Sequence, residues 1–170
     1  KKETNLEKNG KINDALKDGD LILTQISKEP ISSKGPRLTT EISLAGRYMI
    51  LMPFSDRVSI SQKIPDSAEK ARLKKLIRSI KPHGFGVIIR TVAIGKKVAE
   101  LDRDLKNLYK KWQIISKKLK DAQPNIKILG ELNRSEAILR DLLSSKFNNI
   151  HVNSTEVQAE LKEYLSRISP

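Results

Sequence analysis

The residues best suited to chemistry in this chain are Arg90 and Thr91, at the end of a run rich in β-branched residues. A guanidinium group and a hydroxyl group side by side at a strand end can bind a terminal phosphate through several charge-assisted hydrogen bonds. The alternative is that Arg90 pairs with a structural carboxylate and that Thr91 serves the β propensity of the strand. The local pattern alone favours this alternative, so anion recognition needs further support.

Side chains that could catalyse a reaction or hold a metal are sparse. His83 and His151 are the only histidines, and neither has a carboxylate at a metal-ligand spacing. Asp102 and Asp104 are two residues apart on a predicted helix, so they point to different faces. The sequence also has no cysteine, no nucleophile elbow and no phosphate-binding glycine loop. We therefore expect neither catalytic residues nor a metal site in this chain.

Basic residues outnumber acidic residues by 33 to 20, which gives a formal net charge of +13. The excess is concentrated in residues 65–130, which hold 17 basic and 6 acidic residues. Such a concentration is typical of a surface that binds a polyanion. Nucleic acid is favoured over a membrane because the basic helices lack a Trp/Phe-rich opposite face. The alternative is that these lysine-rich helix faces serve only solubility.

The length of 170 residues fits one medium domain or two small ones. No apolar run approaches the about 20 residues of a membrane span, and the first residues do not have the pattern of a signal peptide. The lack of cysteine makes the cytoplasm the expected compartment. Because the chain begins without Met and in polar sequence, we expect it to be a piece of a longer protein.

The first third of the chain is predicted to be rich in β-structure. Strands are expected at residues 20–27, 38–44 and 48–52, with a loop at 30–37 that contains proline and glycine. The strand at 38–44 is indicated by side chains that alternate onto one face, namely Leu38, Thr40, Ile42 and Leu44.

A helix, a strand and a longer helix are predicted next, and these elements must position Arg90. Asp66 and Glu69 have the capping-box spacing at the start of the first helix, which ends before Pro82. The strand spans residues 85–92. The longer helix follows Gly95, and its apolar stripe advances by three and four residues through Val98, Leu101, Leu105, Leu108, Trp112, Ile115 and Leu119.

The remaining residues are predicted to alternate between strand and helix. Strands are expected at 126–129 and 149–152. One helix is expected to begin near Ser135, and a last helix is expected to be capped by Asn153 together with Glu156. This β-α-β-α order indicates a sheet flanked by helices. We assign the whole chain to the α+β class.

A distinctive run begins in the predicted loop, and further short segments follow it along the chain. The run is Lys34-Gly35-Pro36-Arg37-Leu38-Thr39-Thr40-Glu41-Ile42-Ser43-Leu44-Ala45-Gly46-Arg47-Tyr48, with Leu51-Met52-Pro53 behind it. It resembles the run N-K-G-A-x-L-T-T-x-I-S-L-A-G-x-Y-x-V-L-M-P of the ribonuclease E/ribonuclease G family. The match continues through Ile60-Ser61, Gly86-Val87-Ile88-Ile89-Arg90-Thr91, Gly95-Lys96, Tyr109-Lys110-Lys111-Trp112 and Arg140-Asp141-Leu142-Leu143. It covers the chain from about Asp14 to the last helix.

The resemblance implies three pieces. Residues 1–45 would be the C-terminal part of an OB-fold RNA-binding domain. Residues 46–123 would be a mixed α/β 5′-sensor domain, with the long helix, that recognises the 5′-monophosphate of an RNA. Residues 124–170 would be part of a ribonuclease-H-like subdomain that is structural in this family.

The resemblance also implies roles for individual residues. Arg90 and Thr91 match the family's phosphate-binding pair, and Gly46 and Ile50 match positions whose backbone supports that pocket. Lys34 matches an RNA-contacting lysine. The following RNA backbone is expected to contact four cations, namely Lys34, Arg37, Arg47 and Lys63. Where family members have two arginines after Ile-Ser, this chain has Gln62-Lys63, so one contact in the pocket is weakened or is supplied by Lys63 or Arg47.

By resemblance, the parent protein would be a metal-dependent endoribonuclease that cuts single-stranded, AU-rich RNA in RNA processing and decay, and it would be a homo-oligomer. Its magnesium-binding aspartates and its structural zinc would lie in a part absent from this sequence. The chain itself is therefore expected to bind single-stranded RNA with a 5′-monophosphate and to be catalytically inactive.

Two alternatives remain at this point. The chain could be a general RNA-binding module that stacks bases on Phe54, Phe85 or Tyr48 without reading the 5′ end, although aromatic residues make up only 4% of the sequence. It could also be an assembly module in which the stripe from Val98 to Leu119 pairs between chains, although packing of this stripe within one chain is favoured.

Overall fold

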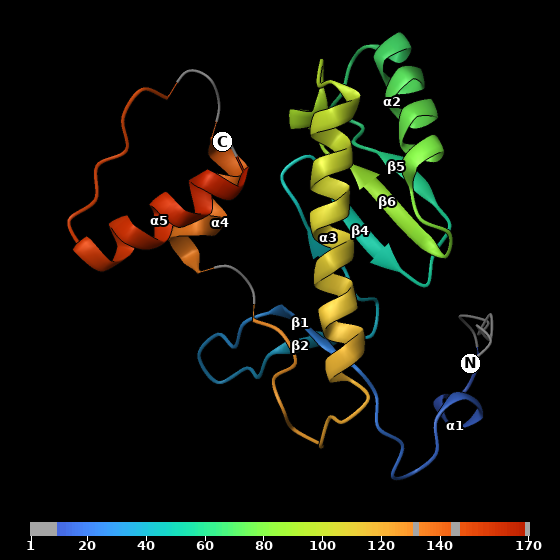
Figure 1. Ribbon diagram of the computed structural model, residues 1–170. Helices are drawn as coiled ribbons and strands as arrows, with labels where there is room; N and C mark the ends of the chain where they lie inside the picture. Colours follow the sequence, from blue (N-terminus) through green and yellow to red (C-terminus); the bar gives the residue numbers. More distant parts are fainter. Residues whose placement is uncertain (1–9, 131–132, 144–146, 169–170) are drawn as a thin grey trace.

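The computed structural model describes residues 10–130, 133–143 and 147–168. They contain both helices and strands in the α+β arrangement that the sequence predicts (Figure 1). In chain order, the elements are α1 (Ile12–Ala15), β1 (Gln25–Lys28), β2 (Arg37–Thr39), β3 (Leu44–Ala45), β4 (Met49–Pro53), β5 (Val58–Ile60), α2 (Ser67–Ile80), β6 (Phe85–Ile89), the 3₁₀-helix η1 (Thr91–Ala93), α3 (Val98–Lys118), α4 (Arg134–Leu142) and α5 (Thr155–Ile168).

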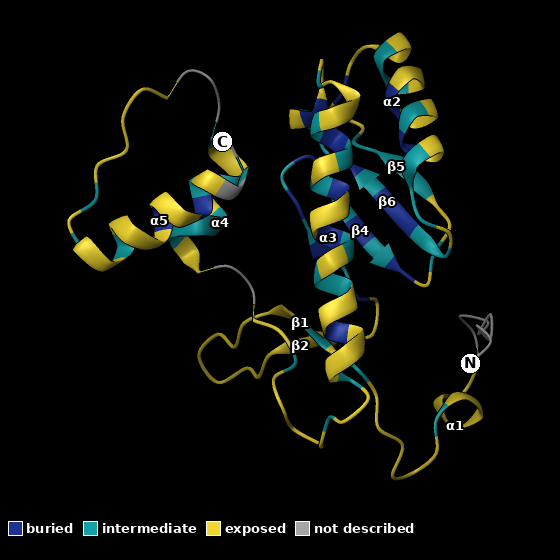
Figure 2. Ribbon diagram, viewed as in Figure 1, coloured by how far each residue is buried: buried dark blue, intermediate teal, exposed yellow. Residues whose placement is uncertain are grey.

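A four-stranded sheet with the order β3-β4-β6-β5 forms the centre of the fold. β4 runs antiparallel to β3 and to β6, whereas β5 runs parallel to β6. Alternate residues of β4 and β6 are fully buried, among them Met49, Leu51, Val87 and Ile89, and they form one core with apolar residues of α2 and α3. Figure 2 shows the buried residues gathered where these helices meet the sheet. Burial of this apolar face is what holds the helices to the sheet.

Helix α2 begins as the sequence predicts but uses Glu69 differently. The Asp66 side chain caps the helix by accepting a hydrogen bond from the backbone nitrogen of Ala68 at 2.8 Å. Glu69 instead pairs with Arg72, with 2.6 Å between Oε2 and Nε, and accepts a hydrogen bond from the backbone nitrogen of Gly95 at 2.9 Å. The residue predicted to complete a capping box therefore ties α2 to the turn that precedes α3.

The apolar stripe of the long helix packs within the chain. Four of its residues are buried against the sheet, namely Leu101, Leu105, Leu108 and Ile115. Val98 at the first turn is exposed, and Trp112 is half-buried in edge-to-face contact with Phe54 and Phe85, at ring-centroid distances of 5.4 and 6.3 Å. Most of the stripe thus packs within the chain, as the sequence favours over pairing between chains.

Three predicted strands have different bounds in the structure. The strand predicted at 20–27 begins only at Gln25. The segment 38–44 is divided, because β2 pairs with β1 in a separate two-stranded sheet whereas β3 joins the central sheet. Its alternation fails at Leu38, which is exposed, while Ile42 and Leu44 are buried. The strand predicted at 85–92 ends at Ile89, because the chain turns into η1 after Arg90.

The two strands predicted after residue 124 are wrong. Within the described residues, 126–129 and 149–152 are irregular segments that pair with no strand, and this part of the chain contributes only α4 and α5. Ile126 and Ile150 are exposed, so their apolar character does not reflect a sheet face. Helix α5 is capped by Ser154 instead of Asn153, since the Ser154 hydroxyl accepts a hydrogen bond from the backbone nitrogen of Val157 at 3.2 Å.

Helices α4 and α5 form a second, smaller core through Leu139, Leu161 and Tyr164. This core is separate from the core of the central sheet. The assignment of residues 1–45, 46–123 and 124–170 to three pieces stays a prediction. Among the described residues, no helix combines the length and the apolar character that crossing a membrane would require.

Candidate anion-binding site

Arg90 directly follows β6, and its position is fixed by both its backbone and its side chain. Its backbone nitrogen donates a hydrogen bond to the Tyr48 carbonyl oxygen at 2.9 Å, which extends the pairing of β4 and β6 by one residue. Its Nη1 donates to the Gly46 carbonyl oxygen at 2.9 Å, and its Nη2 lies 2.8 Å from Oδ1 of Asp141. The side chain is 25% exposed, so the guanidinium group is oriented but still accessible.

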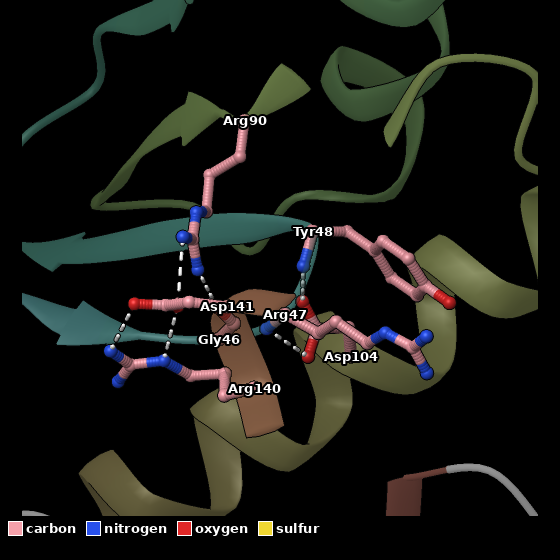
Figure 3. Close-up of polar contacts among 7 residues, drawn as sticks. All are labelled: Gly46, Arg47, Tyr48, Arg90, Asp104, Arg140 and Asp141. Carbon is pink, nitrogen blue, oxygen red and sulfur yellow. Dashed lines mark hydrogen bonds and ion pairs between the residues drawn. The ribbon is translucent and has the colours of Figure 1, made fainter. Parts of the chain in front are cut away.

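The turn between β3 and β4 is held against α3 by Asp104. Oδ1 of Asp104 accepts a hydrogen bond from the backbone nitrogen of Arg47 at 3.2 Å, and Oδ2 accepts one from that of Tyr48 at 2.8 Å (Figure 3). Burial raises the pKa of Asp104, and the hydrogen bonds from the turn oppose this effect. A Cβ atom at Gly46 would lie 2.7 Å from Oδ2 of Asp104, so only glycine allows this approach. The turn that carries the Gly46 carbonyl, which orients Arg90, is therefore fixed by the half-buried carboxylate of Asp104.

Asp141 on α4 lies between two arginines (Figure 3). Its Oδ1 is 2.8 Å from Nη2 of Arg90 and 2.9 Å from Nε of Arg140, and its Oδ2 accepts a hydrogen bond from Nη2 of Arg140 at 3.3 Å. The hydrogen bond from Arg140 is the largest influence on the pKa of Asp141, which is lowered, and the bond from Arg90 adds to it. The site thus holds an anion, and that anion belongs to the chain itself.

A cleft of about 750 Å³ lies next to this site, between the start of α3 and the α4–α5 pair. Its lining includes three cations from the β3–β4 turn and from the first part of α3 with the turn before it, namely Arg47, Lys96 and Arg103. The Arg47 guanidinium crosses to the other wall, where it donates to the carbonyl oxygens of Leu143 and Ile168 at 3.1 and 3.5 Å. The cleft therefore combines accessible positive charge with room for a ligand the size of a nucleotide.

The structure brings some of the predicted site residues together. Gly46, Arg47 and Arg90 belong to one set of contacts, and Thr91 begins η1 directly after Arg90. Ile50 is half-buried on β4, where it pairs with Ala45 and Ile88.

The other predicted cations lie elsewhere. Lys63 is exposed two residues after Ser61, whose backbone nitrogen donates to the Ile89 carbonyl oxygen at 2.9 Å, so it lies at the same end of the sheet as Arg90. Lys34 and Arg37 are exposed on the β1–β2 hairpin, which is a separate sheet. Within the described part of the chain, no hydrogen bond or ion pair joins these two residues to Arg90.

Sequence reasoning missed three residues of the site, namely Asp104, Arg140 and Asp141. The spacing of Asp104 from Asp102 bears only on metal binding, and it gives no sign that the Asp104 side chain accepts hydrogen bonds from a backbone turn more than 50 residues earlier. Arg140 and Asp141 belong to a segment that carries the family resemblance, and this is the one signal that pointed to them. The pairing of Arg90 with a carboxylate is the arrangement that the alternative interpretation predicted.

Comparison of the sequence with known proteins identifies its family. The model of the ribonuclease E/G family matches residues 43–170, which include both the sheet and the α4–α5 pair. The chain belongs to the ribonuclease E/G family.

Individual members of the ribonuclease E/G family match most of the chain. Ribonuclease G of Escherichia coli K12 is 34% identical over 159 residues, which cover 94% of this chain and 32% of that protein. Ribonuclease E of Nostoc sp. PCC 7120 is 35% identical over 158 residues, or 93% of this chain and 23% of the relative. A ribonuclease E/G-like protein of Pyropia yezoensis is 37% identical over 144 residues, or 85% and 28%. The chain thus spans about a third or less of the length of these relatives.

Proposed function

We propose that this chain is the RNA-binding, 5′-monophosphate-sensing part of a ribonuclease E/G-type endoribonuclease that acts in RNA processing and decay. One observation supports the proposal most directly: an oriented, accessible Arg90 guanidinium already holds a carboxylate at 2.8 Å. A group that holds one oxyanion is suited to hold another, because carboxylate and phosphate oxygens accept the same charge-assisted hydrogen bonds. Membership of the family supports the assignment to a ribonuclease.

In this proposal, Arg90 and Thr91 clamp the terminal phosphate, and Gly46 and Ile50 support the pocket through their backbone. A terminal monophosphate carries about −1.5 to −2 charges at pH 7, which is more than the carboxylate that it replaces. A 5′-hydroxyl end lacks this charge, so it gains nothing from the guanidinium group. A 5′-triphosphate is bulkier. It is expected to fit poorly because the β3–β4 turn, which Asp104 holds in place, forms a rigid backbone wall of the pocket.

The RNA backbone beyond the first nucleotide contacts further cations in this proposal, namely Lys34, Arg37, Arg47 and Lys63. Each contact with a phosphate releases counterions, so this part of the affinity falls as the salt concentration rises. Lys34 and Arg37 lie on a different sheet from Arg90, so one RNA strand would have to extend from the central sheet to the β1–β2 hairpin to meet all four.

The cutting of RNA, the metals and the oligomeric state belong to the parent protein in this proposal. The chain has no cysteine for a thiolate zinc site, and the described residues hold no group of three potential metal ligands. These residues do not fit a magnesium or zinc centre, so we derive no catalytic step from them. The cytoplasmic location stays an expectation from composition.

The proposal is tested by the binding of one short single-stranded RNA carrying a 5′-hydroxyl, a 5′-monophosphate or a 5′-triphosphate, at two salt concentrations. We expect the monophosphate to bind at least several-fold more tightly than the other two, with a preference that persists when salt weakens all three. Equal binding of all three RNAs, with a steep dependence on salt, would overturn the proposal.

Equal binding of the three RNAs would favour the second candidate function, a general RNA-binding module. One observation supports this second function: Phe54 is 67% exposed, in edge-to-face contact with Trp112. Exposed rings can stack on unpaired bases without regard to the 5′ end. The other two predicted stacking residues are less suitable, because Tyr48 is buried and Phe85 is half-buried.

A further inference from the structure

Asp141 occupies the position that the proposed function gives to the RNA phosphate. Its carboxylate forms an ion pair with Arg90, with 2.8 Å between Oδ1 and Nη2. Nη1 of the same guanidinium group donates to the Gly46 carbonyl oxygen at 2.9 Å, so the group keeps this orienting contact when Asp141 moves away. We propose that Asp141 is an internal ligand of the 5′-phosphate site, which the RNA end must displace in order to bind. This inference rests on the proposed function.

The charges favour displacement by a terminal phosphate over displacement by the RNA backbone. A backbone phosphodiester carries one negative charge, the same as the carboxylate already in the site. It therefore gains no electrostatic advantage in taking the place of Asp141. A terminal monophosphate carries about −1.5 to −2 charges and more acceptor oxygens, so it pairs more strongly with Arg90 than the carboxylate does. Backbone phosphates are consequently not expected to displace Asp141 from Arg90.

The displaced carboxylate keeps a partner. Arg140 holds Asp141 through two contacts, at 2.9 and 3.3 Å, and lies next to it on α4. When Arg90 pairs with a phosphate, the Asp141 carboxylate therefore stays paired with Arg140. The side chain of Asp141 is 41% exposed, so water also reaches it. The exchange costs little because no charge is left buried and unsatisfied.

Displacement does not require the main core to open. Asp141 is on α4, which belongs to the smaller core with α5, separate from the core of the sheet. Besides the pair between Arg90 and Asp141, Arg47 also links the two cores, because its guanidinium group donates to the Leu143 and Ile168 carbonyl oxygens. Loss of the ion pair between Arg90 and Asp141 would therefore weaken the attachment of α4 to the central sheet. Binding of the 5′ phosphate and docking of the α4–α5 pair would oppose each other, and the coupling would act in both directions.

The direct test is the affinity of wild type, Asp141→Asn and Glu163→Gln for 5′-monophosphate and 5′-hydroxyl forms of one short RNA. Glu163 is an exposed carboxylate on α5, so both variants lose one negative charge and general electrostatics are matched. We expect Asp141→Asn to bind the phosphate RNA several-fold more tightly than Glu163→Gln does, and to bind the hydroxyl RNA equally. Inorganic phosphate, added as a competitor, should displace the phosphate RNA from Asp141→Asn at lower concentration than from Glu163→Gln.

Two results would overturn the inference. If Asp141→Asn binds the phosphate RNA no more tightly than Glu163→Gln, then Asp141 does not compete for the site. If it binds that RNA more weakly, then Asp141 is a positioning residue for Arg90. Asp141→Ala, together with thermal unfolding of each variant, distinguishes these results from misfolding. Absence of any phosphate preference in wild type would instead reject the proposed function itself.

Hydrogen exchange of the wild-type protein gives an independent readout. If the phosphate displaces Asp141, backbone amides of α4 and α5 should exchange faster with the 5′-monophosphate RNA bound than with the 5′-hydroxyl RNA bound. Equal or slower exchange with the phosphate RNA would contradict the opposition between binding and docking.

Discussion

Gly46 serves both the packing of the fold and the proposed phosphate site. Its lack of a side chain lets the β3–β4 turn approach Asp104, and its carbonyl oxygen receives Nη1 of Arg90. The sequence predicts a role for Gly46 only through the family resemblance. The structure adds a physical reason, because an added Cβ would come within 3 Å of both Asp104 and Leu108.

Replacement of this glycine gives the first prediction at the residue scale. Gly46→Ala should destabilise the fold by about 1–3 kcal/mol, since the turn must move away from a packed helix. Gly35→Ala is the matched control, because nothing lies within 4 Å of a Cβ at Gly35. Chemical denaturation of the two variants and wild type measures the difference. Equal stability of the variants would show that the turn does not depend on this close approach.

At the scale of elements, the predictable features are those set by local patterns. The stripe of α3 and the Asp66 cap of α2 are confirmed, because periodicity and capping are properties of neighbouring residues. The strands predicted at 126–129 and 149–152 are wrong, because short apolar runs form strands only where another strand is available to pair. The division of 38–44 between two sheets has the same cause, since the choice of sheet is made by distant partners.

The link between α2 and α3 through Glu69 gives a prediction about pH. Hydrogen bonds from Arg72 and from the backbone of Gly95 lower the pKa of Glu69 to about 2 from its ordinary value near 4.5. Because the folded state binds this proton less readily than the unfolded state, the contribution of Glu69 to stability is present above pH 4.5. It is lost as the pH falls from there towards 2.

Measurement of unfolding free energy between pH 2 and pH 6 checks this prediction in wild type and Glu69→Gln. Wild type should be the more stable protein at pH 6, and the difference should shrink on acidification through the range from 4.5 to 2. A difference between wild type and Glu69→Gln that does not change with pH would contradict the assigned pairing.

At the scale of the whole molecule, the candidate site lies where two separate cores meet. Arg90 and Gly46 belong to the central sheet and its turn, whereas Arg140 and Asp141 belong to the α4–α5 pair. The sequence predicts Arg90 as an anion-binding residue but not its partner, because nothing local relates two residues that are 51 positions apart in the chain. The positive charge of the middle segment is predictable from composition, whereas its arrangement around a cleft is not.

The most direct test of the central claim is the phosphate preference of Arg90→Ala, compared with Arg78→Ala. Arg78 is exposed on α2, so each variant loses one positive charge but only the first loses the proposed phosphate ligand. The ratio of affinities for 5′-monophosphate and 5′-hydroxyl RNA should fall to about one in Arg90→Ala and stay at the wild-type value in Arg78→Ala. A ratio that survives in Arg90→Ala, or that falls equally in both variants, would contradict the account.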